Sequence, residues 1–190
     1  MRRLRATAGV AAFLALAACA SPATGPAPQT VDVPHVAQGA VTQPQAETAS
    51  CTSADGYRVR YPADWSTNEA GVLPACSWFG PGEVVVPEAS DVRTAPVTLQ
   101  VVDGPLAEVA VPMPDEVARI ELQVAGRPAV RTEQVTTLGL FPEGTRITTW
   151  ALDLGDRTLL ADAVELSGGD HESAVAALDE MVGGLHAVDA

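Results

Sequence analysis

The sequence predicts an α+β domain: an antiparallel β-sheet with flanking helices, including an amphipathic helix at the C-terminal end. Two observations predict it. Apolar and polar side chains alternate along several short segments that turn residues separate, which is typical of antiparallel strands joined by hairpins. Near the end of the chain the period becomes helical, and one apolar stripe is formed by Val175, Leu178, Val182 and Leu185.

The first predicted strand begins at Tyr57, where Tyr57, Val59 and Tyr61 point one way and two arginines the other. Pro62 ends it, because proline lacks the N–H that a strand ladder needs. The later strands show the same alternation, and two segments have the pattern of hairpins. The single strand is residues 96–104. The two hairpins are residues 120–135, with a turn at Gly126-Arg127, and residues 145–166, with a turn at Gly155-Asp156.

Helical signals are confined to two places. Residues 105–118 contain three prolines, which favours a loop or a short helix. Asp170 is a suitable N-cap for the C-terminal helix, and Glu172 suits the positive end of its dipole. His171 stands between them, and we expect it to be a surface or capping residue.

Residues 1–18 have the layout of a secretory signal. Three arginines precede an uncharged stretch of thirteen residues, Ala6–Ala18. As a helix it would span about 20 Å, which is short of a hydrocarbon core of about 30 Å. Leu16-Ala17-Ala18-Cys19 is similar to the bacterial lipobox, which implies cleavage before Cys19 and acylation of this cysteine; the alternative is an ordinary secreted protein. Two acyl chains anchor a protein stably, so we expect it at the extracytoplasmic face of the cell membrane.

Residues 19–50 and 51–190 differ in composition. The first range is rich in proline and alanine, has no aromatic residue, and predicts a disordered tether behind the lipidated Cys19. The second predicts a single globular domain. Without residues 1–18, eight arginines face 24 acidic residues, a formal net charge of −16. Such a chain repels nucleic acid and anionic lipid, which excludes nucleic acid as a partner and leaves the acyl chains as the membrane contact.

Cys51 and Cys76 are the cysteines that remain after acylation, and in an exported chain they are expected to form a disulfide. Five of the seven aromatic residues beyond the signal lie close to them in sequence. They allow two interpretations: an aromatic mini-core pinned by the disulfide, or an exposed surface for a ligand or partner. The five residues are Tyr57, Tyr61, Trp65, Trp78 and Phe79.

The order of these segments resembles a known family. Gly56 to Trp65 reads Gly-Tyr-x-Val-x-Tyr-Pro-x-x-Trp, hairpins follow, and the chain closes with a helix ending in Met181-Val182-x-x-Leu185. This is similar to the PsbP-like α+β fold of extrinsic photosystem proteins and of many actinobacterial lipoproteins. The turn Gly126–Arg131 is also similar to turns in those lipoproteins. Lysine is absent and Asn68 is the only asparagine, which is typical of a GC-rich, actinobacterial genome.

The resemblance implies a non-catalytic binding or envelope-assembly factor, and no site residue of the photosystem proteins carries over. The sequence contains no nucleophile elbow, no His-Glu-x-x-His and no phosphate-binding loop, so no catalytic residue, metal or cofactor is predicted. Asp153, Asp156 and Asp162 could hold Ca²⁺ or simply be exposed. Three hypotheses follow: a surface lipoprotein that binds an envelope protein, a carrier of a lipid or other apolar small molecule, and, more weakly supported, a hydrolase of envelope glycans or peptides.

Overall fold

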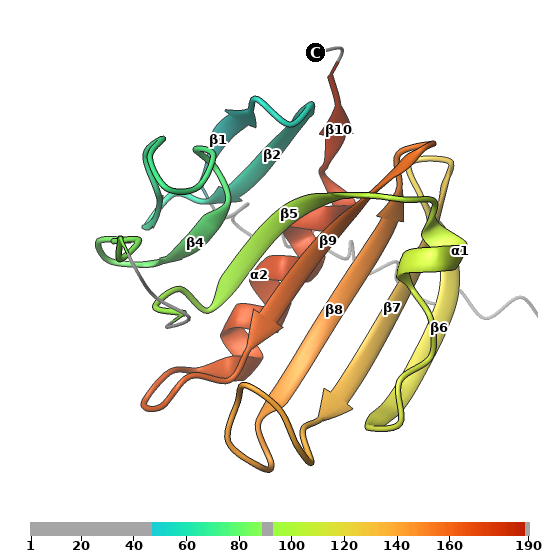
Figure 1. The fold of residues 1–190 in the computed structure, drawn as a ribbon. Helices are drawn as coiled ribbons and strands as arrows, with labels where there is room; N and C mark the ends of the chain where they lie inside the picture. The colour runs from blue at the N-terminus through green and yellow to red at the C-terminus, as the bar shows by residue number, and fades with distance from the viewer. Residues whose placement is uncertain (1–46, 89–92, 189–190) are drawn as a thin grey trace, which may run out of the picture. The chain divides into compact units, whose positions relative to one another are not determined.

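The computed structural model describes residues 47–88 and 93–188, in which two antiparallel sheets pack around one long helix (Figure 1). The small sheet has the order β1-β2-β10, with β1 (Thr48–Ser53), β2 (Tyr57–Pro62) and β10 (His186–Ala187). The large sheet has the order β3-β4-β5-β9-β8-β7-β6. Its strands are β3 (Trp65–Thr67), β4 (Trp78–Pro81), β5 (Val97–Asp103), β6 (Glu116–Val124), β7 (Arg127–Val135), β8 (Arg146–Asp153) and β9 (Arg157–Val164).

The predicted α+β class is wrong, because the described residues form mostly antiparallel β structure. Two helices lie among them: α1 (Leu106–Val109) is a single turn, and α2 (His171–Gly183) is the only one of substantial length. Three prolines at positions 105, 112 and 114 keep α1 short, since proline cannot continue a helix interior. Helix α2 begins directly after Asp170, whose side chain accepts a hydrogen bond from the Ser173 amide at 3.1 Å.

The described residues belong to one compact unit, Gln43–Ala190. Strand β1 begins at Thr48, so the last three residues of the range assigned to the tether pair with β2. The predicted signal at 1–18, the lipidation site Cys19 and tether residues up to 46 lie outside the described residues. Neither helix described is both long and apolar enough to cross a membrane.

The two predicted hairpins form, with one shifted turn. Gly155-Asp156 connects β8 to β9 as expected, and the Leu154 amide donates a hydrogen bond across the turn to the Arg157 carbonyl at 2.9 Å. The turn between β6 and β7 is instead Ala125-Gly126, one residue earlier than predicted, because Val124 pairs with Arg127. Both central residues have positive φ, +49° and +78°, as a hairpin with the right-handed strand twist requires.

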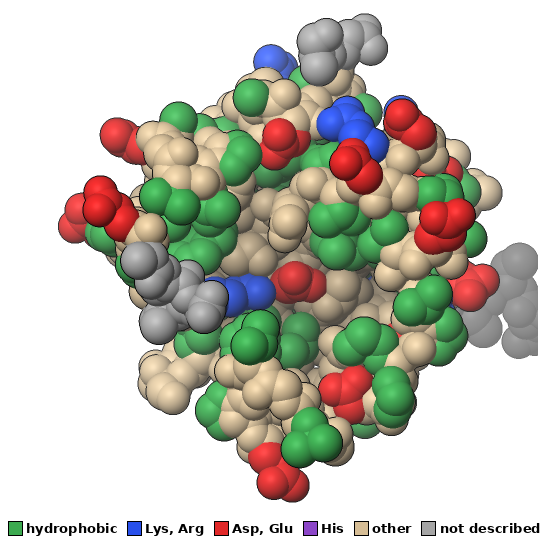
Figure 2. All heavy atoms as spheres, viewed as in Figure 1, with side chains coloured by type: hydrophobic (Ala, Val, Ile, Leu, Met, Phe, Trp, Pro, Cys, Tyr) green, Lys and Arg blue, Asp and Glu red, His purple; other side chains and the backbone are tan. Residues whose placement is uncertain are grey.

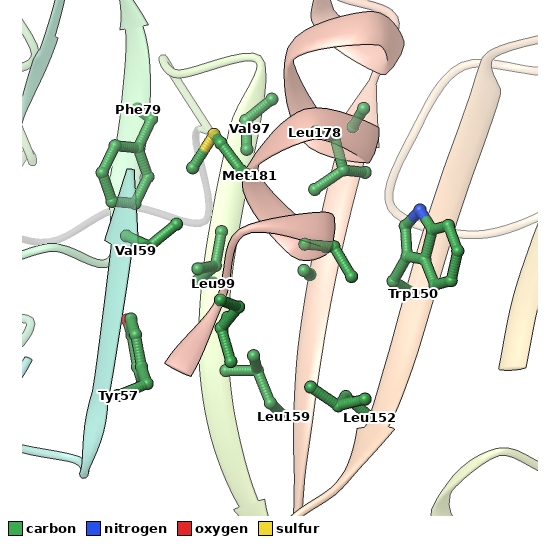
Figure 3. Close-up of a cluster of buried hydrophobic side chains, with 14 of the residues drawn as sticks. Tyr57, Val59, Phe79, Val97, Leu99, Trp150, Leu152, Leu159, Leu178 and Met181 are labelled. Carbon is green, nitrogen blue, oxygen red and sulfur yellow. The ribbon is translucent and has the colours of Figure 1, made fainter. Parts of the chain in front are cut away.

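Helix α2 packs on one face of the large sheet, which we call the helix face. Leu178, Met181 and Val182 are buried there against Val97, Leu99 and Leu159 of the sheet. Figure 3 shows Val59 of β2 on the other side of α2 from Trp150, so the small sheet also contributes to this core. Buried side chains fill the space between the C-terminal half of α2 and the sheets.

A polar cluster ties α2 to the helix face. The Asp179 carboxylate accepts hydrogen bonds from the Trp150 indole N–H at 2.7 Å and from Arg131 Nε at 3.2 Å. Arg131 also donates to Glu133 Oε1 at 2.7 Å. Trp150 and Arg131 come from neighbouring strands β8 and β7, so a single helical carboxylate fixes the rotation of α2 about its axis.

Asp179→Ala should lower the free energy of unfolding by about 2–3 kcal/mol, because it removes a charged hydrogen-bond acceptor and leaves a nearly buried indole N–H unpaired. The adjacent acid provides the control. Glu180 is exposed on the same helix, and Glu180→Ala should change stability by less than about 0.5 kcal/mol. Urea denaturation of both variants measures the difference, and equal effects would contradict this role for Asp179.

Candidate functional site

The five aromatic residues separate into buried and half-buried groups. Tyr57 and Phe79 are fully buried in the core, whereas Tyr61, Trp65 and Trp78 are half-buried. The rings of Tyr61 and Phe79 are 5.3 Å apart between centroids. Burial raises the pKa of Tyr57 to about 12, and its hydroxyl donates to the Cys76 carbonyl at 2.8 Å. Tyr57 and Phe79 thus belong to the core and are not available to a ligand.

The predicted Cys51–Cys76 disulfide is confirmed. Cys51 lies in β1 of the small sheet, and Cys76 lies two residues before the start of β4 of the large sheet. The bond therefore joins the two sheets beside the hydrogen bond from Tyr57.

Asn68 is a structural residue that the sequence analysis missed. Its side-chain oxygen accepts from the amides of Ser77 and Trp78 at 2.9 and 2.8 Å, and its nitrogen donates to the carbonyls of Glu69 and Pro74. It is buried and organises the loop that presents Cys76 to Cys51. The available signal was that this single asparagine lies inside the disulfide loop.

A recess lies on the surface of the large sheet opposite α2, on what we call the open face. The segment containing α1 crosses this face and packs against β8 and β9. Beneath it is a hollow of about 220 Å³ with an apolar rim and a partly polar floor. The rim includes Val111 and Met113, and the floor includes Thr132, Gln134 and Thr149. Figure 2 views this face and shows apolar side chains around a central depression that holds an acidic group beside a basic one.

Arg93 and Asp162 form a largely buried pair at this face. Arg93 Nη2 donates to the Asp162 carbonyl at 2.8 Å, while Nη1 lies 3.9 Å from the Asp162 carboxylate. Thr149 Oγ1 donates to the same carboxylate at 2.7 Å. Burial raises the pKa of Asp162 although Arg93 and Thr149 oppose this, and burial lowers the pKa of Arg93 to about 10. The floor of the hollow, which Asp162 lines, thus holds a carboxylate that is costly to ionise.

A second hollow, of about 380 Å³, lies on the helix face beside α2 and is lined by His171, Glu133 and Asp179. The expectation that His171 is a surface residue is wrong, because it is only 8% exposed. Burial and the nearby Arg146 lower its pKa, and its Nδ1 has no hydrogen-bond partner among the described residues. Glu133 and Asp179 are both bound by Arg131, so these carboxylates already serve the attachment of α2.

The three aspartates considered for Ca²⁺ serve separate functions. Asp162 bonds Thr149, whereas Asp153 accepts the Gly155 amide at 2.8 Å within the hairpin loop, where Asp156 is exposed. Among the residues the structure describes, no group of three or more His, Cys, Asp or Glu side chains could hold a metal ion.

No family model and no curated protein matches the sequence. Among solved structures, a crystal structure from Bacteroides thetaiotaomicron VPI-5482 has a TM-score of 0.48 at 14% identity. The match covers 76% of this chain and 49% of the Bacteroides chain. The solution structure of cyanobacterial PsbP (CyanoP) from Synechocystis sp. PCC 6803 has a TM-score of 0.45 at 11% identity. The match covers 82% of this chain and 99% of the CyanoP chain. The chain is thus similar to a PsbP structure at low identity, and this likeness supports no conclusion about activity.

The raised pKa of Asp162 predicts a pH dependence of stability. Above the ordinary aspartate value of 3.8 the unfolded chain loses this proton while the folded chain retains it. The contribution of Asp162 to the unfolding free energy therefore falls as the pH rises through this window. Urea titrations of the wild type and Asp162→Asn should show their difference declining over the window. Thr149→Val, which removes a hydrogen bond that lowers this pKa, should extend the decline to higher pH. A pH-independent difference would contradict the assignment.

Proposed function

We propose that the chain is an actinobacterial surface lipoprotein whose domain binds an envelope protein partner without catalysis. The observation that supports this most is the hollow on the open face, where an apolar rim surrounds a floor of polar side chains. Sites that bind ligands or partners commonly combine apolar walls with a few polar groups that fix orientation.

A neighbouring hollow of about 580 Å³ enlarges this surface. It lies on the other side of the α1 segment and shares Val111, Arg119 and Val130 with the first. The shared lining residues show that the two hollows adjoin each other. Two adjoining hollows suit an extended polypeptide that carries apolar side chains. The acidic chain, with a formal net charge of −13, favours a neutral or basic segment.

The packing of α2 favours this proposal over the two alternatives. A carrier of apolar molecules needs space between the helix and the sheet, and Leu178 and Met181 fill that region with Leu99 and Leu159. A hydrolase needs carboxylates free to act near His171. Of those near His171, Arg131 binds Glu133 and Arg146 binds Glu165, while Glu172 is exposed to solvent.

The membrane anchor is tested at Cys19. The whole wild-type chain, expressed in an actinobacterial host, should partition into the detergent phase of a membrane extract and lose its first 18 residues. Cys19→Ala should shift the protein to the soluble fraction, because the acceptor of the acyl chains is gone. An unprocessed chain or an unchanged distribution of the variant would overturn the anchor.

The binding surface is tested by photo-cross-linking in living cells. A photoreactive residue replacing Met113, on the rim of the hollow, should form one discrete adduct with an envelope protein. The same residue at Val72, which is exposed elsewhere, serves as the control. Val111→Asp should reduce the adduct about tenfold, since burying a carboxylate against an apolar partner costs at least about 1.4 kcal/mol. Equal adducts from positions 113 and 72 would contradict the proposal.

A further inference from the structure

Strand β6 is the long free edge of the large sheet. Within the part of the chain that the structure describes, β6 pairs only with β7, and Figure 1 shows it as the outermost strand on that side. The opposite edge is β3, with three residues, whereas β6 has nine. A free edge presents unpaired N–H and C=O groups to any strand that can align with it.

Strand β6 carries three charged side chains and one register shift, but it lacks the other features that usually prevent pairing. Residues 116–124 contain no lysine and no proline. Ile120 is 55% exposed, and Val117 and Leu122 are exposed as well. The register of β6 with β7 shifts between Glu116 and Ala118, so the irregularity lies at the start of the strand. The regular remainder, 118–124, alternates apolar side chains on the helix face with charged or polar ones on the open face.

We propose that two copies of this chain associate through β6, antiparallel about a two-fold axis at Ile120. The argument is the complementarity of the strand with itself. In this register Ile120 lies opposite Ile120 of the second copy, and Ala118 lies opposite Leu122. Arg119 lies opposite Glu121, and symmetry repeats each of these unlike pairs. The three apolar pairs fall on the helix face, and the two ion pairs on the open face.

The neighbouring registers are unfavourable. Side chains of directly opposed residues must lie on the same face of the sheet, so the two-fold axis must pass through a residue. Moving the axis by one residue along β6 shifts the partner of every residue by two positions. Centring on Arg119 places two guanidinium groups opposite each other. An axis at Glu121 places two carboxylates opposite each other. Like charges directly opposite are destabilising, so the register at Ile120 is selected by charge as well as by apolar contact.

The side chains are placed to make these pairs. Arg119 already donates to Glu116 at 3.1 Å and to the Ala110 carbonyl, which holds its guanidinium in position. Glu121 is 78% exposed on its side chain and lies 3.8 Å from Arg119 of its own strand. Pairing requires the exposed Glu121 side chain to reach across to an arginine whose guanidinium is already oriented.

The register is tested by disulfide cross-linking of the whole chain in cell membranes. Ile120→Cys should give a dimer on non-reducing gels, because directly opposed Cβ atoms lie about 5 Å apart. Leu122→Cys or Ala118→Cys alone should not, since each would lie about 13 Å from its counterpart. The double variant A118C/L122C should cross-link again. Leu138→Cys, on an exposed loop, reports random collision.

A charge exchange tests the same dimer without cysteine. Glu121→Arg should weaken dimerisation about tenfold in sedimentation of the detergent-solubilised chain, because it places two pairs of arginines opposite each other. Adding Arg119→Glu should restore the affinity, since the pairs are then reversed. Loss without restoration, or a monomer with no cross-link at position 120, would overturn the proposal. Equal cross-linking at positions 118, 120 and 122 would overturn the register. Dimers that form only after deletion of residues 20–46 would overturn the proposal for the whole chain, because they would mean that the tether binds the β6 edge.

Discussion

The architecture depends on one constraint: a single helix must cover one face of a sheet that is wider than the helix. Helix α2 has thirteen residues, so it is about 20 Å long and about 10 Å wide. Seven strands at about 4.8 Å spacing span about 29 Å. The helix therefore covers mainly β9 and β8 and leaves the ends of the sheet to other elements. At one end the small sheet extends the cover through β2. At the other end no described element covers β6, and its apolar side chains remain exposed.

The small sheet has few residues of its own to bury, so it depends on its attachment to the rest of the domain. Val59 and Tyr57 pack beside α2, the Tyr57 hydroxyl bonds the Cys76 carbonyl, and the disulfide covalently closes the same junction. A disulfide that closes a 25-residue separation contributes about 3.5 kcal/mol through the entropy of the unfolded chain. Asn68 supports this contribution indirectly by fixing the loop that carries Cys76.

Local patterns predicted what local interactions determine. The alternation at Tyr57–Tyr61, the Gly155-Asp156 turn and the Asp170 cap all involve residues a few positions apart, and each forms. The α+β class was wrong because it assumed several flanking helices, whereas α2 is the only helix of substantial length among the described residues. The candidate site was not predicted, since Arg93 meets Asp162 across 69 positions and the hollow on the open face joins four strands whose order no periodicity reveals. The five clustered aromatic residues allowed both a mini-core and an exposed surface, and Tyr57 and Phe79 lie in the core.

The two proposals reinforce each other through geometry. A two-fold axis at Ile120 runs perpendicular to the sheet, so both open faces of a dimer lie on the same side and a partner with two segments can occupy both. Simultaneous occupation multiplies affinity through effective concentration, without any new contact. Effective concentration also governs the formation of the dimer.

Two acidic chains repel each other, which makes pairing of the β6 edges weak in dilute solution. Acyl anchors would confine both chains to one surface and raise their mutual concentration, so a weak, charge-matched edge becomes sufficient where the protein is anchored.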